Sequence, residues 1–444
     1  MTSSSAGAFD SGRGPQHLAP VMDIAKHIDA FVTQNLARET AFLAELVKVA
    51  SDNPPGDCAP HAARTKQLLE ELGFSVEPHS VPRAVVEAAG MKSATNLMVR
   101  HCFGEGPVVA LNAHGDVVPP GLGWTRDPYG AAIEDGPHGP TMYGRGVAVS
   151  KSDFATYAFA LLALRDAAAQ GAKLGGTVEL QFTYDEEVSG VVGPKWLLDQ
   201  GLTKPNFVLA AGFSYWIVTA HNGCLQLEVT VTGMQAHAAL PDTGIDALEA
   251  ANGILADLYA SRAELARVKS RVPGISTATL NVGLIRGGIN TNVVPDQVVF
   301  RLDRRIIPEE TPAEVEAALR ARIIAAAGKY PGITVDIRRV LLASPLVPQP
   351  GVDRIIGAIQ AHARRVLGTD VPVQGVPLFT DARHYAERGI PIVLYGAGPP
   401  TLIEARGHNT DENLRLSDLR AATRIVAAAV GDLLSQRAQG ASLS

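Results

Sequence analysis

Short apolar runs typical of β-strands alternate with segments of helical periodicity along most of this chain. Strands are predicted at 74–80, 96–101, 108–112 and 177–184, and helices at 22–49, 61–72 and 152–170. This alternation is typical of a mostly parallel sheet flanked by helices, because parallel strands need a long crossover connection. We therefore expect the α/β fold class.

The pattern changes near residue 224 and returns after residue 345. Between these points the sequence predicts four strands and two helices, at 225–232, 246–262, 276–286, 298–304, 311–329 and 333–341. Neighbouring strands of this kind suggest a compact α+β unit with one open sheet face. We predict a discontinuous main domain (21–223 and 343–436), an inserted second domain (224–342) and a flexible tail (1–20).

Composition excludes several kinds of partner. The formal net charge of −6 argues against nucleic acid or an anionic membrane as the main partner. The N-terminal segment lacks the basic start and apolar run of a secretory signal, and no apolar stretch is long enough to span a bilayer. We therefore expect a cytoplasmic protein that acts on a small molecule.

Two groups of polar residues directly follow predicted strands. His114 and Asp116 come after the run 108–112, and the acidic segment 185–187 comes after the run 177–184. Open α/β sheets bind their ligands at the carboxyl ends of strands, so both groups are site candidates. Asp116 can accept a hydrogen bond from one ring nitrogen of His114 and leave the other nitrogen free to bind a metal ion.

The acidic segment reads Asp185-Glu186-Glu187. Three adjacent carboxylates repel one another, and a cation would relieve that repulsion. One glutamate can bind the ion while its neighbour takes a proton from water that the ion activates. A solvated acidic turn is the alternative for this segment, as a structural loop histidine is for His114.

Three later segments also carry reactive side chains. His408 lies in a glycine-bearing loop, and Asp411 and Glu412 behind it are expected to cap a helix at 416–434. His237 follows a glycine inside the inserted domain, and Arg383 belongs to the segment Thr-Asp-Ala-Arg.

Taken together and in order, eight short motifs resemble the two-zinc amidohydrolase family. That family includes aminoacylase, carboxypeptidase G, acetylornithine deacetylase and succinyl-diaminopimelate desuccinylase. The motifs are NPPGD at 53–57, HGDVVP at 114–119, YGRG at 143–146, DEE at 185–187, GMQAHAALP at 233–241, NTNVVPD at 290–296, TDAR at 380–383 and GHNTDE at 407–412. The resemblance implies a zinc-carboxypeptidase-like α/β/α catalytic domain with an inserted lid that mediates formation of a homodimer.

The resemblance also implies roles for the matching residues. The implied metal ligands are His114, Glu187 and His408, with Asp116 as the partner of the first and Glu186 as the general base. His237 corresponds to a lid histidine that reaches the partner subunit's active site and polarises the scissile carbonyl. The implied substrate-binding residues are Asn292, Arg305 and Arg383, since a guanidinium suits bidentate contact with a carboxylate.

Two ligands that the family uses for a second ion are absent. Val149 stands where the family has an aspartate that bridges both ions, and valine has no donor atom. The stretch 210–214, Ala-Ala-Gly-Phe-Ser, lacks the acidic ligand expected after a predicted strand at 207–211. Two histidines and one carboxylate are a complete set for one catalytic ion with open positions. We therefore predict a single divalent ion, zinc or manganese.

Asp153 and His221 are the residues that could replace the lost ligands. For Asp153 we favour the interpretation of a solvated helix start, and for His221 that of a structural histidine.

The expected function is hydrolysis of an amide-type C–N bond in a small carboxylate-bearing substrate, with Glu186 as the general base. One alternative is hydrolytic deamination of an amino-substituted aromatic acid, the reaction of a relative in the same family, 5-nitroanthranilate aminohydrolase. Another is a catalytically inactive relative that binds a small molecule.

Overall fold

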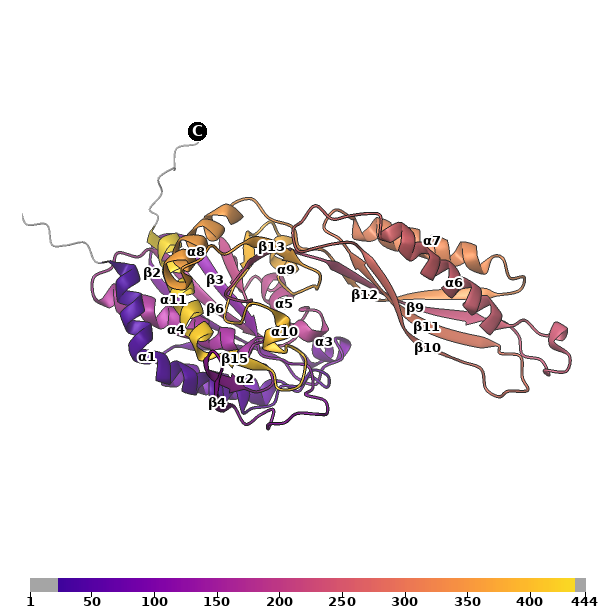
Figure 1. Cartoon of the computed structure of the whole chain (residues 1–444), viewed down its shortest axis with the longest axis horizontal. Coiled ribbons are helices and arrows are strands. Elements are labelled where there is room, and N and C mark those ends of the chain that lie inside the picture. Colours follow the sequence, from indigo (N-terminus) through magenta and orange to yellow (C-terminus); the bar gives the residue numbers. More distant parts are fainter. Residues whose placement is uncertain (1–22, 436–444) are drawn as a thin grey trace, which may run out of the picture.

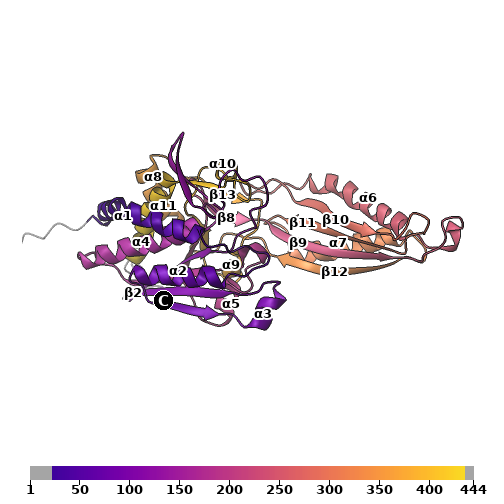
Figure 2. The ribbon, with the colours of Figure 1, turned by 90° about the horizontal axis from the view of Figure 1, so that it is seen from below.

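The computed structural model describes residues 23–435 and shows an elongated molecule made of two parts (Figures 1 and 2). The larger part contains both ends of the described chain, and the smaller part projects from it. The flexible tail predicted at 1–20 lies outside the described residues. Among residues 23–435, no helix combines the length and the apolar character needed to cross a membrane.

The larger part is built on an eight-stranded sheet with the strand order β1-β2-β6-β3-β7-β14-β8-β13. Its strands are β1 (Val76–Ser80), β2 (Thr95–Gly104), β3 (Val108–His114), β6 (Gly176–Thr183), β7 (Phe207–Ala210), β8 (Ile217–His221), β13 (Val373–Val376) and β14 (Ile392–Leu394). The pairs β3–β6, β3–β7, β7–β14 and β8–β13 are parallel. The pairs β1–β2, β2–β6 and β8–β14 are antiparallel, so the sheet is mixed, with parallel pairing in four of its seven strand pairs.

Helices cover both faces of this sheet. One layer contains α1 (Ile24–Val47), α2 (Ala59–Glu71), α4 (Lys151–Ala169), α8 (Val352–Leu367) and α11 (Leu416–Ser435). The opposite face carries α5 (Pro194–Asp199) and α9 (Arg383–Ala386), and α3 (Arg83–Ala88) and α10 (Leu402–Ala405) are further short helices. Along β3, Leu111 belongs to the larger core and Ala110 to the smaller one, because successive side chains point to opposite faces.

A small three-stranded sheet borders the larger part. It contains β4 (Ala132–Gly136), β5 (Gly139–Tyr143) and β15 (Asn413–Arg415), in the order β15-β5-β4. The pairing of β15 with β5 is antiparallel and brings the late segment around His408 next to the loop that follows β5. Two motifs more than 250 residues apart in sequence are thereby joined, as the bond between Arg145 and Glu412 shows (|i−j| = 267).

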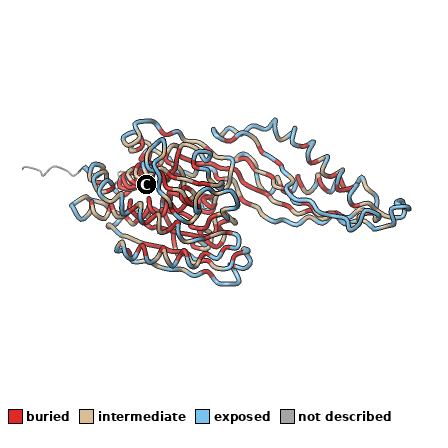
Figure 3. Tube along the Cα trace, turned by 60° about the horizontal axis from the view of Figure 1, so that its bottom comes forward, coloured by how far each residue is buried: buried red, intermediate tan, exposed pale blue. Residues whose placement is uncertain are grey.

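The projecting part, which we call the lid, has its own sheet and core. Its four strands are β9 (Gly223–Thr232), β10 (Thr279–Gly287), β11 (Gln297–Ile306) and β12 (Thr334–Ala343), all antiparallel in the order β10-β11-β9-β12. Helices α6 (Ala247–Leu265) and α7 (Pro312–Ala327) pack on the sheet through a core separate from that of the larger part. Figure 3 shows exposed residues over most of the lid surface. The layers agree with the predicted α/β/α domain carrying an α+β insertion.

Candidate active site

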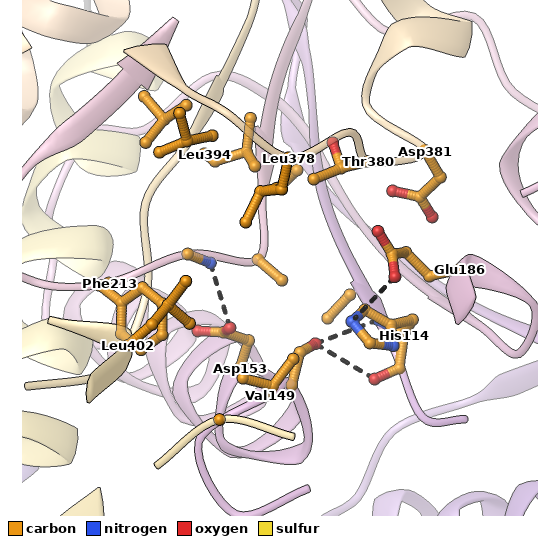
Figure 4. Close-up of a pocket in the computed structure, with 18 of the residues that line it drawn as sticks. His114, Val149, Asp153, Glu186, Phe213, Leu378, Thr380, Asp381, Leu394 and Leu402 are labelled. Atoms are coloured by element: carbon orange, nitrogen blue, oxygen red, sulfur yellow. Dashed lines mark hydrogen bonds and ion pairs between the residues drawn. The ribbon is translucent and has the colours of Figure 1, made fainter. Parts of the chain in front are cut away.

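A cavity of about 390 Å³ lies where central strands of the large sheet end (Figure 4). His114 closes β3, and the two glutamates follow β6 in the short helix η1 (Glu186–Val188). The loops after β7 and β14 complete the wall on the other side. This is the edge at which open α/β sheets bind their ligands.

His114 is buried, and its two ring nitrogens face different partners. Nδ1 lies 3.0 Å from the backbone carbonyl oxygen of Asp116 and 3.4 Å from one of its carboxylate oxygens. Nε2 lies 3.9 Å from Oε2 of Glu186. A hydrogen bond donated by Nδ1 to Asp116 leaves Nε2 able to bind an ion. The contact with Asp116 runs chiefly through its backbone carbonyl, and not through the carboxylate that the sequence suggested.

The carboxylate of Asp116 accepts hydrogen bonds from other residues. It accepts hydrogen bonds from the backbone N–H groups of Glu186 and Glu187, each at 3.2 Å, and from Nδ2 of Asn53 at 3.0 Å. Because Asp116 is fully buried, these bonds fix the start of η1 relative to the end of β3.

The structure brings His114, Glu186 and Glu187 together. One potential ligand atom from each of these residues lies within 4.8 Å of the other two. His408, the third predicted ligand, joins the group through Glu187, since its Nε2 lies 3.2 Å from Oε1 of Glu187. The side chain of His408 is half exposed, whereas that of Glu187 is 7% exposed. His408 therefore stands at the mouth of the site and Glu187 inside it.

The surroundings of these groups shift their acidities. Burial alone would lower the pKa of His114, but the hydrogen bond to Asp116 and the charges of Glu186 and Glu187 raise it well above its usual value. Burial raises the pKa of Glu186 well above its usual range, with Glu187 adding to the effect and His114 opposing it. The close contact with the carboxylate of Glu187 raises the pKa of His408.

This donor set fits a divalent ion. Imidazole nitrogens and carboxylate oxygens are common ligands of zinc and manganese. Oε1 of Glu187 is buried and makes no hydrogen bond of good geometry, although Nε2 of His408 is 3.2 Å away. A buried carboxylate oxygen without a partner is costly unless a cation lies beside it. The residues that would hold the ion are His114, Glu187 and His408.

The segment that lacks the bridging aspartate is well ordered by Glu412. This buried carboxylate accepts hydrogen bonds from Nη1 of Arg145 at 2.7 Å and from the backbone N–H groups of Ala148 and Val149, each at 3.0 Å. Its side chain is thus turned toward the loop after β5, and the prediction that Glu412 caps α11 is wrong. Asp411 is also no cap of α11, because its carboxylate accepts from Thr125.

The interpretation of Asp153 as a solvated helix start is wrong, because the residue is fully buried at the cavity wall. Its carboxylate accepts from the backbone N–H of Ala397 at 2.9 Å and of Gly212 at 3.3 Å, and burial raises its pKa to about 8. His221 is buried between backbone groups: Nδ1 lies 2.9 Å from the carbonyl of Asn222, and Thr380 donates to Nε2 at 3.3 Å. Both ring nitrogens of His221 are therefore engaged away from the candidate ligands.

The residues expected to bind substrate lie in three different places. Arg305, near the base of β11, lines the cavity, and its guanidinium lies 5.5 Å from the ring centre of Phe379. Arg383 is only 3% exposed and donates to the backbone carbonyls of Ser189 at 2.6 Å and Thr380 at 3.1 Å. The structure thus places Arg383 behind the cavity wall, where it supports the loop between β13 and α9, and the expectation that it binds substrate is not supported.

His237 and Asn292 lie at the far end of the lid. The bridge between His237 and Val293 and the hydrogen bond from Ala238 to the carbonyl of Asn292, at 3.0 Å, hold these two loops together. Both residues are exposed. Strands β9 and β11, which run to this end, each have ten residues, and a strand of that length spans roughly 30 Å. Neither residue lines the cavity of its own chain.

Sequence reasoning missed several residues of the cavity wall. Asp381 lies beside Glu186 (Figure 4), is 6% exposed, and has a carboxylate oxygen without a hydrogen-bond partner. The apolar wall was also missed, because single apolar side chains in loops carry no periodic signal. The motif Thr-Asp-Ala-Arg at 380–383 contains Asp381 and could have indicated this residue.

Comparisons with known proteins show the family of the chain. The profile of peptidase family M20/M25/M40 matches residues 110–432. The chain is 29% identical over 370 residues to a succinyl-diaminopimelate desuccinylase from Methylobacterium nodulans, covering 81% of this chain and 87% of that protein. A succinyl-diaminopimelate desuccinylase from Wolinella succinogenes is 26% identical over 358 residues, covering 78% of this chain and 89% of that protein.

Solved structures share the fold over nearly their whole length. The M20 family metallo-carboxypeptidase Sso-CP2 from Sulfolobus solfataricus has a TM-score of 0.71 at 19% identity, covering 89% of this chain and 99% of that chain. Aminopeptidase PepT from Bacillus cereus has a TM-score of 0.68 at 22% identity, with 90% and 99% covered. The Bacillus subtilis YXEP protein, a dinuclear metal-binding peptidase, has a TM-score of 0.62 at 18% identity, with 91% and 99% covered.

Proposed function

Because the chain belongs to peptidase family M20/M25/M40, a family of metal-dependent hydrolases acting on amide-type C–N bonds, we propose that it cleaves such a bond in a small carboxylate-bearing substrate at a site with one divalent ion. The observation that carries this proposal is the convergence of His114, Glu186 and Glu187 within 4.8 Å, with His408 against Glu187. These residues come from strand ends and loops far apart in sequence.

The proposed division of labour follows from the surroundings of each side chain. Asp116 orients His114, and Glu187 and His408 complete the ligand set. When bound, the ion would act as a Lewis acid and lower the pKa of a water molecule toward ~7. Glu186 takes a proton from the attacking water and returns it to the leaving nitrogen, a role favoured by its position 3.9 Å from His114 on the cavity side.

The apolar side chain at Val149 supports a single ion. Two close cations need a bridging carboxylate to offset their repulsion, and Val149 offers none. Asp153 is the nearest carboxylate on that wall, and both its oxygens already accept backbone hydrogen bonds. This differs from the YXEP protein, which is described as dinuclear.

A second candidate reaction is hydrolytic deamination of an amino-substituted aromatic acid. The aromatic side chains of Phe213, Trp216 and Phe379 in the cavity wall favour it. Both reactions add water across a C–N bond and would use the same base, so the difference lies in whether ammonia or a larger amine leaves.

We also propose that the protein is a homodimer in which His237 of one subunit serves the active site of the other. The distance of His237 from the cavity of its own chain supports action in trans. Edge strand β10 supports a partner surface, because Leu284 and Ile285 are 61% and 56% exposed there. An exposed apolar edge strand is normally covered by another chain or by charged residues.

Release of nitrogen products tests the proposed function directly. The metal-loaded protein should release an amine or ammonia from a panel of N-acyl amino acids and aminobenzoates, and a chelator should abolish that release. Added zinc or manganese should restore it. Chelator-insensitive release would contradict the metal-dependent mechanism, and no release with either panel and no bound metal would favour an inactive binding protein.

A further inference from the structure

The cavity has two chemically different sides. His114, Glu186 and Asp381 lie at one side (Figure 4), together with Glu187 and His408, which contact this group. The other side is apolar, and its principal members are Phe213, Trp216, Val376, Leu378, Phe379 and Leu394. We call this second side the apolar chamber. A bound molecule that reaches the metal-binding side chains must fill or face this chamber.

The apolar chamber includes the segments in which a second ion would need its ligands. Val149 and Phe213 stand in the two segments that lack the family's acidic residues, and both line the cavity. The ring of Phe213 packs edge-on against Trp216, with ring centres 6.2 Å apart. Gly398 makes room for this ring, since a Cβ there would lie only 1.8 Å from Cδ1 of Phe213.

Asp153 does not make this side polar. Its two carboxylate oxygens accept from Ala397 and Gly212, as described above, and the residue is fully buried. Gly396 is the counterpart of Gly398, because a Cβ there would lie 1.8 Å from Oδ1 of Asp153. These hydrogen bonds therefore hold the carboxylate against the backbone of Ala397 and Gly212.

One cation stands at the border of the apolar chamber. The guanidinium of Arg305 lies over the ring of Phe379, and its Nε donates to Oδ1 of Asp303 at 2.8 Å. The remaining guanidinium donors have no other hydrogen-bonding partner among the interactions found for residues 23–435. An arginine with its face on a ring and free N–H groups is suited to bind a carboxylate.

We propose that the substrate carries an apolar, ring-sized group that occupies the apolar chamber while its carboxylate pairs with Arg305. This inference rests on the proposed function, which places the scissile C–N bond at His114 and Glu187. A cavity of about 150 Å³ lined by apolar side chains can admit a benzene molecule. The volume of about 390 Å³ leaves room for one ring and the polar group beside the metal ligands.

Binding of unreactive carboxylates to the metal-loaded protein tests the inference without any turnover. Calorimetric titration should give a dissociation constant for benzoate at least about tenfold lower than for acetate or succinate. Phe213→Ala should weaken benzoate binding about tenfold and leave acetate binding unchanged. Leu402→Ala, at the cavity rim, provides a second variant in case Phe213→Ala does not fold.

Matched controls separate the apolar chamber from general effects. Leu122 is 96% exposed outside the cavity, so Leu122→Ala should bind benzoate like the unchanged protein. Arg305→Gln should weaken benzoate and acetate together, whereas Arg301→Gln, on the same strand and paired with Glu228, should weaken neither.

The outcomes distinguish this inference from the proposed function. Equal affinity of the protein for benzoate, acetate and succinate would overturn the inference even if C–N hydrolysis is found. Equal benzoate affinity of the variants at Phe213, Leu402 and Leu122 would overturn it as well. Tight and Phe213-dependent benzoate binding would support it even if no hydrolysis is found.

Discussion

Glu186 and Glu187 are neighbours in sequence, yet their side chains have different surroundings. Glu187 is 7% exposed and directs Oε1 toward His408, whereas Glu186 faces Nε2 of His114 and the carboxylate of Asp381. A ligand must stay ionised in the interior, while a base must exchange a proton with the substrate. The two positions therefore suit a ligand at Glu187 and a base at Glu186.

Exchange of each glutamate for glutamine should separate these roles. Glu186→Gln should lower kcat by about 10²- to 10⁴-fold, the contribution typical of a general base, and retain bound metal. Glu187→Gln should lower the metal content as well as the rate. The measurements are steady-state kinetics and elemental analysis on the same preparations.

Two results would contradict this assignment. Loss of the ion from Glu186→Gln would make Glu186 a ligand, and full metal retention by Glu187→Gln would remove Glu187 from the ligand set. Lys195→Gln, an exchange in an exposed i,i+4 ion pair with Asp199, serves as a control and should change neither quantity.

Single residues also show what the sequence could and could not predict about the site. His114 and the glutamate pair were predictable because they follow strongly apolar strands. The task of Glu412 was not predictable, because it depends on the loop after β5, more than 260 residues away in sequence (|i−j| = 263 to its contact with Val149). The burial of Asp153 was missed for the same reason, since its partners Gly212 and Ala397 come from the loops after β7 and β14.

Among the elements, β10 has one edge that no strand of the described residues pairs with. It is one edge of the lid sheet and carries exposed Leu284 and Ile285, and Ile289 beyond its end is 73% exposed. If two lids pair along this edge, the backbone groups of β10 gain partners and these side chains are covered. In such a dimer, His237 would lie nearer the cavity of the partner than its own.

Charge placed on this edge should therefore prevent dimer formation. The double variant Leu284→Lys with Ile285→Lys should sediment as a monomer and lose most activity, because His237 would no longer be supplied in trans. Leu122→Lys, a change at a residue of the larger part that is 96% exposed, should remain dimeric and active. A dimeric edge variant, or a monomer with full activity, would refute the proposal.

Long elements were predictable, and short ones were not. Helix α4, predicted at 152–170, is observed at Lys151–Ala169, because an uninterrupted segment of 19 residues gives a long helical signal. Strands β8 and β13 were missed, since runs of five and four residues give little periodic signal. These two strands lie at one edge of the sheet, where β8 pairs antiparallel with β14. Because they were missed, the sequence suggested a more uniformly parallel arrangement.

On the scale of the whole molecule, the two separate cores explain how one chain combines a rigid site with a distant lid. The larger part holds the candidate ligands on strand ends anchored in its core, while Arg305 is the lid residue that reaches the cavity. Under the proposed function, chemistry and substrate recognition are divided between the two parts. The fold is that of the family, and the departure lies in the residues around Val149 and Phe213.

The number of metal ions per chain tests the central claim most directly. The protein should be loaded with excess zinc or manganese, dialysed against metal-free buffer and measured by elemental analysis, with anomalous diffraction to locate the ion. The account predicts one ion per chain, between His114, Glu187 and His408. Two ions per chain, with a second peak beside Val149, would contradict it.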